Sequence, residues 1–596
     1  MKFTTRPEIT GTFGVATSTH WIASTVGMSM LERGGNAFDA AVAMGFTLNV
    51  VEPHLNGPGG DLPAIFYAAG STGPRVLCAQ GVAPAKATIE HYRSEGLTLI
   101  PGSGLLATVV PGAFDGWMTL LRDYGTMSLR EVMAPAISYA QAGHPILPRV
   151  ADTIAGLKDF FLEEWPTSAE AWLIGGRPPR AGELFANPAL AAMWTRIVAE
   201  AEAVGGREQQ IEAARSAFYR GFVAETVGKF FETAEVMDAT GEQRKGVLAA
   251  DDFANWSATY EAPLSCDYGD WTVHKTGPWG QGPVLLQALA ILDGLSFVDL
   301  DPLSPDYVHL VIEAMKLAFA DREAFYGDSA ESEIPMELLL SPEYAAQRRA
   351  LLVETASLEQ RPGQLAGYED WASEAISRAA RMEDVSSGAG GGEPTMAHLS
   401  ERRGDTVHLD VIDRFGNMIS ATPSGGWLQS SPVIPGLGMP MNSRAQMFWL
   451  KEGLPSSLVP GRRPRTTLSP SLASFEGNPT LAFGTPGGDQ QDQWQLILFL
   501  RLAHQSYNLQ EAIDAPLFHT AHFQSSFYPR VARPGHLMIE PAFGEETIAA
   551  LRARGHEVSV AEPWTIGRLT AAKRDPNGLM HAAATPRLMQ AYAIGR

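Results

Sequence analysis

Cysteine and basic residues are both scarce in this chain of 596 residues. The only two cysteines are Cys78 and Cys266, so a disulfide framework, a cysteine-rich zinc site and an iron–sulfur cluster are excluded. The 45 lysines and arginines stand against 66 acidic residues, which leaves a net charge of −21. Non-specific binding to nucleic acid or to an anionic membrane surface needs a basic face, so we expect neither kind of partner.

Long apolar runs are also missing. The longest ones, such as LILFL at 496–500, are far shorter than the roughly 20 residues that cross a bilayer. The N-terminal segment lacks the apolar core of a signal peptide. Hydrophobic residues make up 45% of the chain and charged residues 19%, which is enough apolar material for a large buried core. We therefore expect a folded cytoplasmic protein.

Several well-known catalytic and cofactor motifs do not occur. The chain has no G-x-S-x-G, no Walker A sequence and no H-E-x-x-H, so it offers no support for a serine α/β-hydrolase, a P-loop protein or a zincin. The glycines at 388–392 follow no strand and precede no helix, unlike a dinucleotide-binding loop. His408 and Asp410 lack a third partner, and we interpret them as hydrogen-bonding groups rather than metal ligands. No cofactor or metal is expected.

Helical periodicity dominates residues 1–405. It predicts two helices within 20–52, a mostly helical stretch over 105–260 and further helices over 284–327. The glycine-rich turn at 54–61 leads into a predicted strand. This part of the chain is therefore expected to be rich in helices.

The sequence changes character at 386–405, where glycine, serine and charged residues predict a flexible linker. The following TVHLDVID alternates apolar and polar residues like a half-buried strand, and RFG forms a short turn before a returning strand. With glycine at the positive-φ position of that turn, Thr406 lies opposite Ser424 and His408 opposite Thr422. Hydroxyl groups from both strands would then converge near Thr406. Because threonine is common in strands, the pattern alone also fits an ordinary hairpin.

Ordered sequence blocks extend along nearly the whole chain. They include LERGGNAFDAAVAM with VEPHLNGPGGD, APAKAT at 83–88, GDTVHLDVIDRFGNMISATPS at 404–424, RPRTTLSPSL at 463–472, FGTPGGD at 483–489 and DAPLFH at 514–519. In these blocks the chain resembles the γ-glutamyltransferase (γ-glutamyltranspeptidase) family of N-terminal nucleophile hydrolases. It resembles a divergent member of the amidohydrolase or acylase kind.

The resemblance implies an α+β fold, a four-layer αββα sandwich, made as a zymogen that undergoes autocatalytic cleavage between Asp405 and Thr406. Residues 1–405 would form a large (α) subunit that ends in the linker 386–405. Residues 406–596 would form a small (β) subunit that begins with the nucleophile. The two subunits of the same precursor are expected to remain one folded unit, and the sequence leaves open whether several copies assemble into a homo-oligomer.

The resemblance also implies the catalytic residues. Thr406 would be the nucleophile, and its freed α-amino group would be the base, since an α-amino pKa of about 7.7–8.0 is close to working pH. Thr422 and Ser424 match the hydroxyl pair that orients the nucleophile. Gly487 and Gly488 match the two backbone N–H groups of the oxyanion hole, where glycine permits close approach of the backbone.

The positions that hold a γ-glutamyl group in this family are largely changed. Ile89 stands where the family has an arginine that binds the α-carboxylate. Gly426 replaces an asparagine and is followed by the bulky Trp427. Arg444 and Met447 stand where a glutamine and an aspartate hold the α-ammonium group. A buried ammonium group without a carboxylate partner costs several kcal/mol, so glutathione is expected to be a poor substrate.

The remaining pocket positions keep some polar character. Thr466 and Thr467 replace two carboxylate-binding serines and retain a hydroxyl group each. Arg444 offers a guanidinium group suited to an anionic acyl group, and Arg465 could assist it. A purely structural role for either arginine fits the sequence equally well.

We therefore predict an amidohydrolase that forms an acyl–Thr406 intermediate with a small-molecule amide. The acyl donor is expected to be an anionic dicarboxylic monoamide, oxamate-like or glutaryl-like, without a free α-amino group. The first alternative is a true γ-glutamyl hydrolase or transferase that acts on glutathione-like substrates. The second is a catalytically silent binding protein, which the matching nucleophile and oxyanion-hole positions disfavour.

Overall fold

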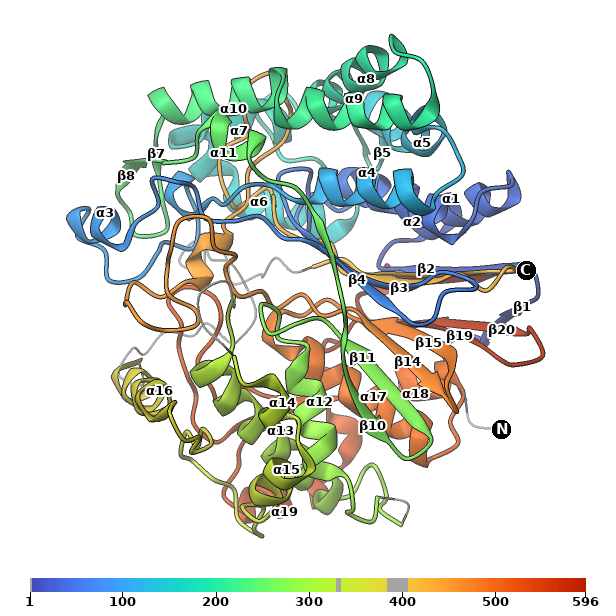
Figure 1. Cartoon of the computed structure of the whole chain (residues 1–596), viewed down its shortest axis with the longest axis vertical. Coiled ribbons are helices and arrows are strands. Elements are labelled where there is room, and N and C mark those ends of the chain that lie inside the picture. The colour runs from blue at the N-terminus through green and yellow to red at the C-terminus, as the bar shows by residue number, and fades with distance from the viewer. Residues whose placement is uncertain (1–2, 298, 329–333, 383–405) are drawn as a thin grey trace.

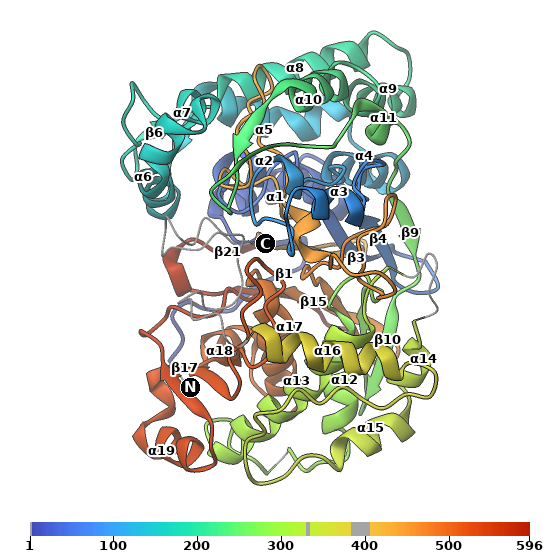
Figure 2. The ribbon, with the colours of Figure 1, turned by 90° about the vertical axis from the view of Figure 1, so that its left-hand side faces the viewer.

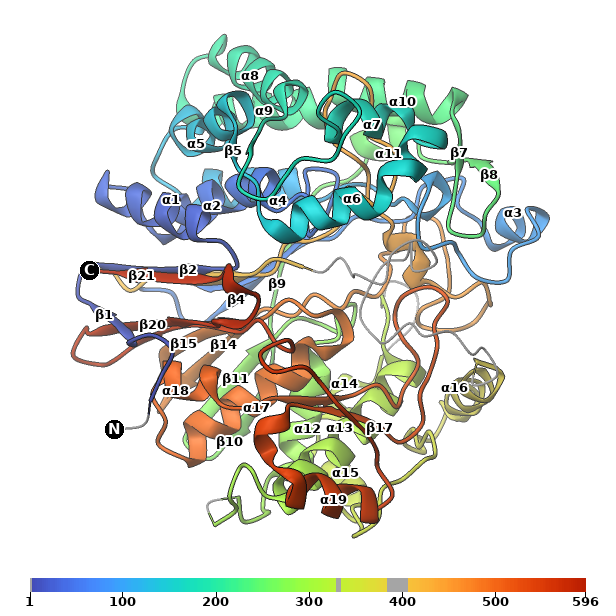
Figure 3. The same ribbon diagram turned by 180° about the vertical axis from the view of Figure 1, so that it is seen from behind.

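The computed structural model describes residues 3–297, 299–328, 334–382 and 406–596. The predicted linker 386–405, with Asp405, lies outside these ranges. Two large sheets lie one above the other in the middle of the molecule, and helices cover the outer face of each sheet (Figure 1). The same order of helices, sheet, sheet and helices is visible from the side (Figure 2) and from behind (Figure 3).

Sheet 1 contains the predicted hairpin and has seven antiparallel strands. Its order is β21 (Tyr592–Gly595), β2 (Gly14–Ser18), β12 (Leu409–Asp413), β13 (Met418–Ala421), β3 (Leu62–Tyr67), β4 (Arg75–Ala79) and β9 (Thr259–Glu261). The hairpin strands β12 and β13 therefore lie in the centre of the sheet, between strands from the N-terminal part of the chain.

Sheet 2 also has seven antiparallel strands. Its order is β1 (Ile9–Gly11), β20 (Met580–Ala584), β19 (Thr570–Arg574), β15 (Asn478–Gly484), β14 (Ser471–Phe475), β11 (Trp271–Lys275) and β10 (Leu264–Tyr268). A smaller three-stranded sheet has the order β16 (Phe518–Thr520), β17 (His536–Ile539) and β18 (Glu557–Val560). In two further strand pairs, β5 (His144–Pro145) lies next to β6 (Leu184–Phe185), and β7 (Glu235–Met237) lies next to β8 (Gln243–Lys245).

The two helices predicted within 20–52 are confirmed, and they pack directly on sheet 1. They are α1 (Trp21–Glu32) and α2 (Ala37–Val51). Asn36 and Asp39 form a capping box that satisfies amide groups at the start of α2. The rest of this helical cover comprises α3 (Ile89–Ser94), α4 (Ala113–Tyr124), α5 (Leu129–Ala142), α6 (Pro148–Glu163), α7 (Pro166–Trp172), α8 (Pro188–Glu202), α9 (Arg207–Tyr219), α10 (Phe222–Thr233), α11 (Ala250–Ala254) and the short 3-10 helix η1 (Leu105–Ala107).

A second set of helices covers sheet 2. Those predicted over 284–327 are α12 (Pro283–Leu292) and α13 (Pro305–Phe325). The others are α14 (Met336–Leu339), α15 (Pro342–Arg349), α16 (Glu369–Met382), α17 (Gln491–His504), α18 (Leu509–Asp514), α19 (Glu545–Ala553) and the 3-10 helices η4 (Pro541–Phe543) and η5 (Arg587–Met589). Among the described residues, no helix combines the length and the apolar character needed to span a bilayer.

Each sheet is covered on both faces, so its strands carry apolar side chains in both directions. In β12, Val411 belongs to the core between sheet 1 and its helices, whereas the next residue, Ile412, belongs to the core between the two sheets. The other helical layer has its own core against sheet 2, which includes Phe483 of β15. Three apolar layers therefore hold the structure together, and the hairpin of β12 and β13 lies between two of them.

The register predicted for the hairpin is confirmed. Leu409 pairs with Ala421 and Ile412 with Met418, the same alignment that sets position 406 opposite 424. The prediction of a half-buried strand is wrong, because every residue of β12 is buried. Sheet 2 covers the face that the sequence pattern assigned to solvent, so the polar side chains of this strand lie between the sheets.

Candidate active site

Thr406 lies immediately before β12, at the end of the strand and inside the molecule. Its side chain is almost fully buried, and its Oγ1 lies 3.2 Å from the Oγ of Ser424. The amide of Val407 donates to the carbonyl oxygen of Pro423 at 3.3 Å, which continues the pairing of the hairpin to this point. The predicted pairing of the Thr406 and Ser424 hydroxyl groups is thus present in the structure.

Ser424 is held by the glycine-rich turn that precedes β3. Its amide donates to the Asp61 carbonyl at 3.0 Å, and the Asp61 amide donates to the Ser424 carbonyl at 2.8 Å. A Cβ atom on Gly60 would lie 2.0 Å from that carbonyl oxygen, so only glycine permits this approach. The Ser424 hydroxyl also lies 3.4 Å from the carbonyl oxygen of Leu55. The turn therefore positions the partner of Thr406.

Thr422 makes a different contact from the predicted one. Its Oγ1 lies 2.8 Å from Nδ1 of His408, and Nε2 of His408 lies 2.9 Å from Asp410 Oδ1. Thr570 of β19 donates to the other Asp410 oxygen at 2.8 Å. A chain of buried hydrogen bonds thus links the two sheets through the polar face of β12. The sequence interpretation of His408 and Asp410 as hydrogen-bonding groups agrees with this arrangement, and the alternation of polar residues was its signal.

The loop with Gly487 and Gly488 begins beside the hairpin. A Cβ on Gly484, the last residue of β15, would lie 2.1 Å from the His408 ring, so strand and ring are in close contact. Gly487 and Gly488 have φ values of +133° and +53° and lead into the 3-10 helix η3 (Gly488–Gln490) and then α17. Within the described ranges neither glycine amide donates to another protein group. Two amides at a helix start can therefore receive an anionic oxygen.

Arg444 occupies the 3-10 helix η2 (Arg444–Met447) and is completely buried. Its guanidinium forms an ion pair with Asp61 at 3.0 Å and lies over the ring of Trp427. Burial raises the pKa of Asp61, and the positive charge of Arg444 opposes that shift. The charge of Arg444 is therefore paired with Asp61, but its Nη1 and Nη2 are buried and have no hydrogen-bond partner among the described residues. Its predicted role as an anion anchor stays a prediction.

Met447 belongs to a small apolar cluster with Trp427 and Phe527. Ile89 belongs to a neighbouring apolar cluster that includes Ala445. The surroundings of both predicted pocket residues are therefore apolar, in line with the loss of charged groups at these positions.

Arg465, Thr466 and Thr467 follow one another on a buried segment but have different partners. Arg465 forms an ion pair with Glu323 at 2.7 Å, so its charge is compensated within the chain. The Thr466 amide donates to the Trp279 carbonyl at 2.8 Å. The Thr467 hydroxyl is buried and, in the part of the chain that the structure describes, has no hydrogen-bond partner. The Thr467 hydroxyl is thus available to a ligand, and the Thr466 hydroxyl accepts from the Leu468 amide at 3.3 Å.

Two further glycine contacts shape the loop after Ser424. Gly426 has a φ of +65°, and its carbonyl oxygen would lie 2.4 Å from a Cβ on Gly57. A Cβ on Gly426 itself would lie 3.0 Å from the Gly60 nitrogen, so both the positive φ and the close packing favour glycine at this position. Gly426 brings Trp427 to the position where its Nε1 donates to the Leu55 carbonyl at 2.7 Å.

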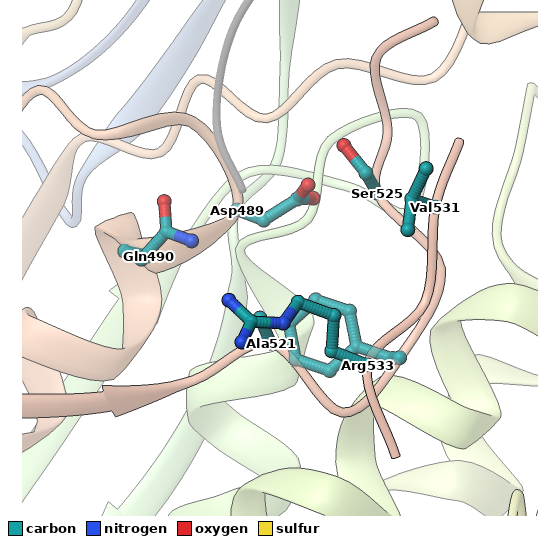
Figure 4. Close-up of a pocket in the computed structure, with 7 residues that line it drawn as sticks. Asp489, Gln490, Ala521, Ser525, Val531 and Arg533 are labelled. Carbon is teal, nitrogen blue, oxygen red and sulfur yellow. The ribbon is translucent and has the colours of Figure 1, made fainter. Parts of the chain in front are cut away.

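The segment 521–533 was not singled out in the sequence, yet it lies against the site. Its Ser526 amide donates to the Asp489 carboxylate at 2.8 Å, and its Tyr528 amide donates to Gln446 Oε1 at 3.0 Å. It therefore connects the glycine loop to η2. Seven residues line a pocket here, six of them labelled in Figure 4: Asp489, Gln490, Ala521, Phe523, Ser525, Val531 and Arg533. No local motif marks this segment, because only tertiary contacts place it here.

One group of side chains has the composition of a metal site. His309, Glu313 and His556 are buried, with ligand atoms within 4.8 Å of one another. However, the two histidine rings hydrogen-bond to each other at 2.8 Å, and Glu313 forms ion pairs with Lys316 at 2.6 Å and Arg361 at 3.1 Å. Two cations already neutralise the carboxylate, so these residues form a structural network rather than a site suited to a metal ion.

Comparison with known proteins gives a consistent result. The family model for gamma-glutamyltranspeptidase matches residues 23–595. The glutathione hydrolase-like YwrD proenzyme of Bacillus subtilis is 30% identical and covers 97% of this chain and 98% of its own. The oxamate amidohydrolase proenzyme of Klebsiella pneumoniae is 31% identical and covers 97% of both chains.

Solved structures match over the full length as well. The structure of LmbA2991HD is 52% identical, with a TM-score of 0.93 and complete coverage of both chains. The cephalosporin acylase from Bacillus halodurans is 28% identical, with a TM-score of 0.82, and covers 100% of this chain and 98% of its own. The mixed helix and sheet arrangement is therefore shared with these proteins.

Proposed function

Because the chain belongs to the gamma-glutamyltranspeptidase family of enzymes, we propose that it is a self-processing amidohydrolase whose nucleophile is Thr406. The single observation that carries this proposal is the buried pair of hydroxyl groups on Thr406 and Ser424 at the start of β12. The amides of Gly487 and Gly488, which donate to no group of the described residues, support it, because their loop begins beside this strand. In this proposal the two stacked sheets and their helical covers are the αββα sandwich of an N-terminal nucleophile hydrolase.

Maturation creates the active nucleophile. The Thr406 hydroxyl oxygen attacks the carbonyl carbon of Asp405, and the peptide nitrogen leaves as the new α-amino group of Thr406. Water then hydrolyses the resulting ester, which frees the Asp405 carboxyl group and restores the Thr406 hydroxyl. The products are a large subunit of residues 1–405 and a small subunit of residues 406–596. In sheet 1, β2 of the large part lies between β21 and β12 of the small part, and β13 of the small part pairs with β3 of the large part, so the two subunits stay together after cleavage.

The catalytic cycle uses the same atoms. The freed α-amino group takes the proton from the Thr406 hydroxyl, whose oxygen attacks the amide carbonyl of the substrate. The amides of Gly487 and Gly488 stabilise the negative charge that develops on the carbonyl oxygen. The amine leaves with the proton, and water hydrolyses the acyl–Thr406 ester. Ser424 hydrogen-bonds to the nucleophile and keeps its oxygen in position.

The substrate is an amide whose acyl group carries a negative charge and no α-amino group. Met447 lies in an apolar cluster, where an ammonium group would lose its hydration without gaining a carboxylate partner. The names of two similar proteins, an oxamate amidohydrolase and a cephalosporin acylase, agree with this choice. The residues proposed to contact the substrate are Ile89, Gly426, Trp427, Arg444, Met447, Arg465, Thr466 and Thr467.

Hydrolysis of γ-glutamyl amides is the second candidate, because one observation favours it. Asp61 lies beside Arg444, and its Oδ2 is buried without a hydrogen-bond partner among the described residues. That oxygen is an acceptor that an ammonium group could use. The glutathione hydrolase-like relative from Bacillus subtilis gives this candidate further support.

Replacement of the nucleophile tests the proposal. Purified wild-type protein should separate on a denaturing gel into pieces of about 44 and 20 kDa, scaled by length from 64.1 kDa. Thr406→Ala should stay uncut and should lose amide hydrolysis by at least about a thousandfold, since no side-chain nucleophile remains. Thr406→Ser is the matched control and should retain cleavage. A full-length active wild-type protein, or an active Thr406→Ala variant, would disprove the proposal.

A further inference from the structure

The pocket beside the glycine loop is lined by residues that the reaction scheme does not use. Asp489 and Gln490, which follow Gly488, form one side of it, and the segment from Ala521 to Arg533 forms the other (Figure 4). The space between these two sides is partly open to solvent. Because the loop supplies both the proposed oxyanion hole and one wall, a substrate bound at Thr406 has this pocket within short reach.

Arg533 is the cation among the residues that line this pocket. Its guanidinium points across the pocket toward the side formed by Asp489 and Gln490 (Figure 4). Among the residues that the structure describes, it forms no ion pair and donates no side-chain hydrogen bond, although its backbone amide donates to the Ala521 carbonyl at 3.0 Å. By contrast, Arg322 and Arg465 each form short ion pairs with carboxylates. Arg533 is therefore anchored by its backbone and free at its charged end.

The Asp489 carboxylate does not neutralise Arg533. One of its oxygens accepts from Arg322 at 2.5 Å and from the Ser526 hydroxyl at 2.6 Å, and the other accepts from the Ser526 amide at 2.8 Å. Both oxygens thus already accept hydrogen bonds from neighbours other than Arg533. The negative charge of Asp489 is therefore already balanced by Arg322 before any ligand binds.

The interior next to the pocket carries an excess of positive charge. Glu323 forms ion pairs with both Arg322 and Arg465. Burial raises the pKa of the Glu323 carboxyl group, but the charges of these arginines outweigh burial and bring the pKa to about 2. Arg530 is buried, donates to two backbone carbonyls and pairs with no carboxylate in the described ranges. Burial and the charge of Arg465 lower the pKa of Arg530 to about 9. An anion in the pocket would reduce this imbalance.

We propose that this pocket is a carboxylate-binding subsite in which the Arg533 guanidinium holds a carboxylate of the amide substrate, with the Ser525 hydroxyl as a second donor. The proposal rests on the proposed amidohydrolase function and adds to it the group that recognises negative charge. A guanidinium can bind a carboxylate bidentately. The charge of Arg444 is already paired with Asp61, whereas Arg533 forms no ion pair with a carboxylate of the described residues. The carboxylate belongs either to the acyl group or to the leaving amine.

Matched substrates separate these two sources. Glutaryl-4-nitroanilide carries the charge on the acyl side, N-butyryl-4-aminobenzoate carries it on the leaving side, and butyryl-4-nitroanilide carries none. Arg533→Gln should raise KM by roughly 10- to 100-fold for one of the charged substrates and change the neutral one less than about twofold. Arg533→Lys should recover part of the loss. Arg552→Gln, a change at an exposed arginine of α19, is the control and should behave like the wild type.

A direct binding measurement keeps this test independent of catalysis. Calorimetry with glutarate should detect binding to the wild-type protein and a loss of at least about tenfold in affinity in Arg533→Gln. If the wild type cleaves no anilide, the proposed function fails, while glutarate binding still decides on the subsite. If the wild type is active but Arg533→Gln leaves the KM of both charged substrates and the glutarate affinity unchanged, the subsite is disproved and the proposed function stands.

Discussion

The hairpin of Thr406 and the arginine-rich surroundings of Asp489 meet at the Gly487–Gly488 loop, but they are built from different interactions. The two strands of the hairpin are joined by hydroxyl and imidazole hydrogen bonds between residues near each other in the sequence, such as Thr406 and Ser424, 18 positions apart. Around Asp489, ion pairs join residues far apart in the sequence, such as Arg322 and Asp489, 167 positions apart.

This difference implies that the hairpin and the surroundings of Asp489 have different roles in catalysis. Hydroxyl groups held by a rigid strand pair can keep a nucleophile in position, but they cannot distinguish a charged substrate from a neutral one. Buried arginines can make that distinction because their charge is costly to leave uncompensated. Changes in the hairpin should therefore lower kcat, and changes around the pocket should alter KM and the preference for charge.

The largest expected contrast concerns substrate charge. Glutaryl anilides should exceed γ-glutamyl anilides in kcat/KM by roughly 30- to 150-fold, because the extra ammonium group would be buried at a differential cost of about 2–3 kcal/mol. Met447→Asp should narrow this ratio by supplying a carboxylate partner, and Met447→Leu should leave it unchanged. Steady-state kinetics with both anilides measures it. A ratio below one would favour the γ-glutamyl alternative.

Ser424→Ala should mainly affect the chemical step. We expect kcat of processed enzyme to fall by roughly 10- to 100-fold, while the free energy of unfolding falls by only about 1 kcal/mol for one lost hydroxyl. Ser474→Ala is a matched control, since Ser474 is a buried strand serine that contacts His274 in sheet 2. Single-turnover rates together with denaturant unfolding give both quantities. An unchanged kcat in fully processed Ser424→Ala would show that this serine has no role in the chemical step.

Asp410→Asn probes the hydrogen-bond chain behind Thr422. Loss of the carboxylate weakens the bond that holds the His408 ring, and a loss of about 1 kcal/mol corresponds to a roughly fivefold lower kcat. KM should stay the same, because no substrate contact is assigned to this residue. Steady-state kinetics of processed enzyme should show this loss in Asp410→Asn and not in Ser474→Ala. An unchanged kcat in Asp410→Asn would give the hydrogen-bond chain a purely structural role.

The smallest expected effect concerns the pH dependence of the free energy of unfolding, through a histidine outside the active site. Burial, together with Lys316 and other nearby cations, lowers the pKa of His556 to about 3. In the unfolded chain His556 binds a proton near pH 6.5, whereas in the folded chain it binds one only near pH 3. The contribution of neutral His556 to the free energy of unfolding is therefore complete above pH 6.5 and is lost as the pH falls from 6.5 toward 3. Between pH 7 and pH 5 the wild type should lose about 1–2 kcal/mol more than His556→Gln. Denaturant unfolding at the two pH values measures this difference, and equal losses would contradict the burial of a neutral ring.

Much of the fold and part of the site follow from local sequence. The two helices within 20–52 have strong periodicity and a capping box at Asn36, and both are present. The hairpin register is set by a short turn with glycine, and the structure confirms it. The burial of the polar face of β12 could not be read from the sequence, because it depends on a second sheet whose strands come from other parts of the chain.

The candidate site divides in the same way. The pairing of Thr406 with Ser424 is a consequence of strand geometry, since residues opposite each other in an antiparallel pair bring their side chains close together. The family resemblance added the glycine pair and the positions of the pocket. The sequence could not predict the partners of the buried arginines. Arg444 pairs with Asp61, and Arg465 pairs with Glu323. Arg533 lines a pocket and forms no ion pair with the described residues. A charge acts over distance in space, and whether an arginine meets a carboxylate or an empty pocket depends on where the folded chain brings them together.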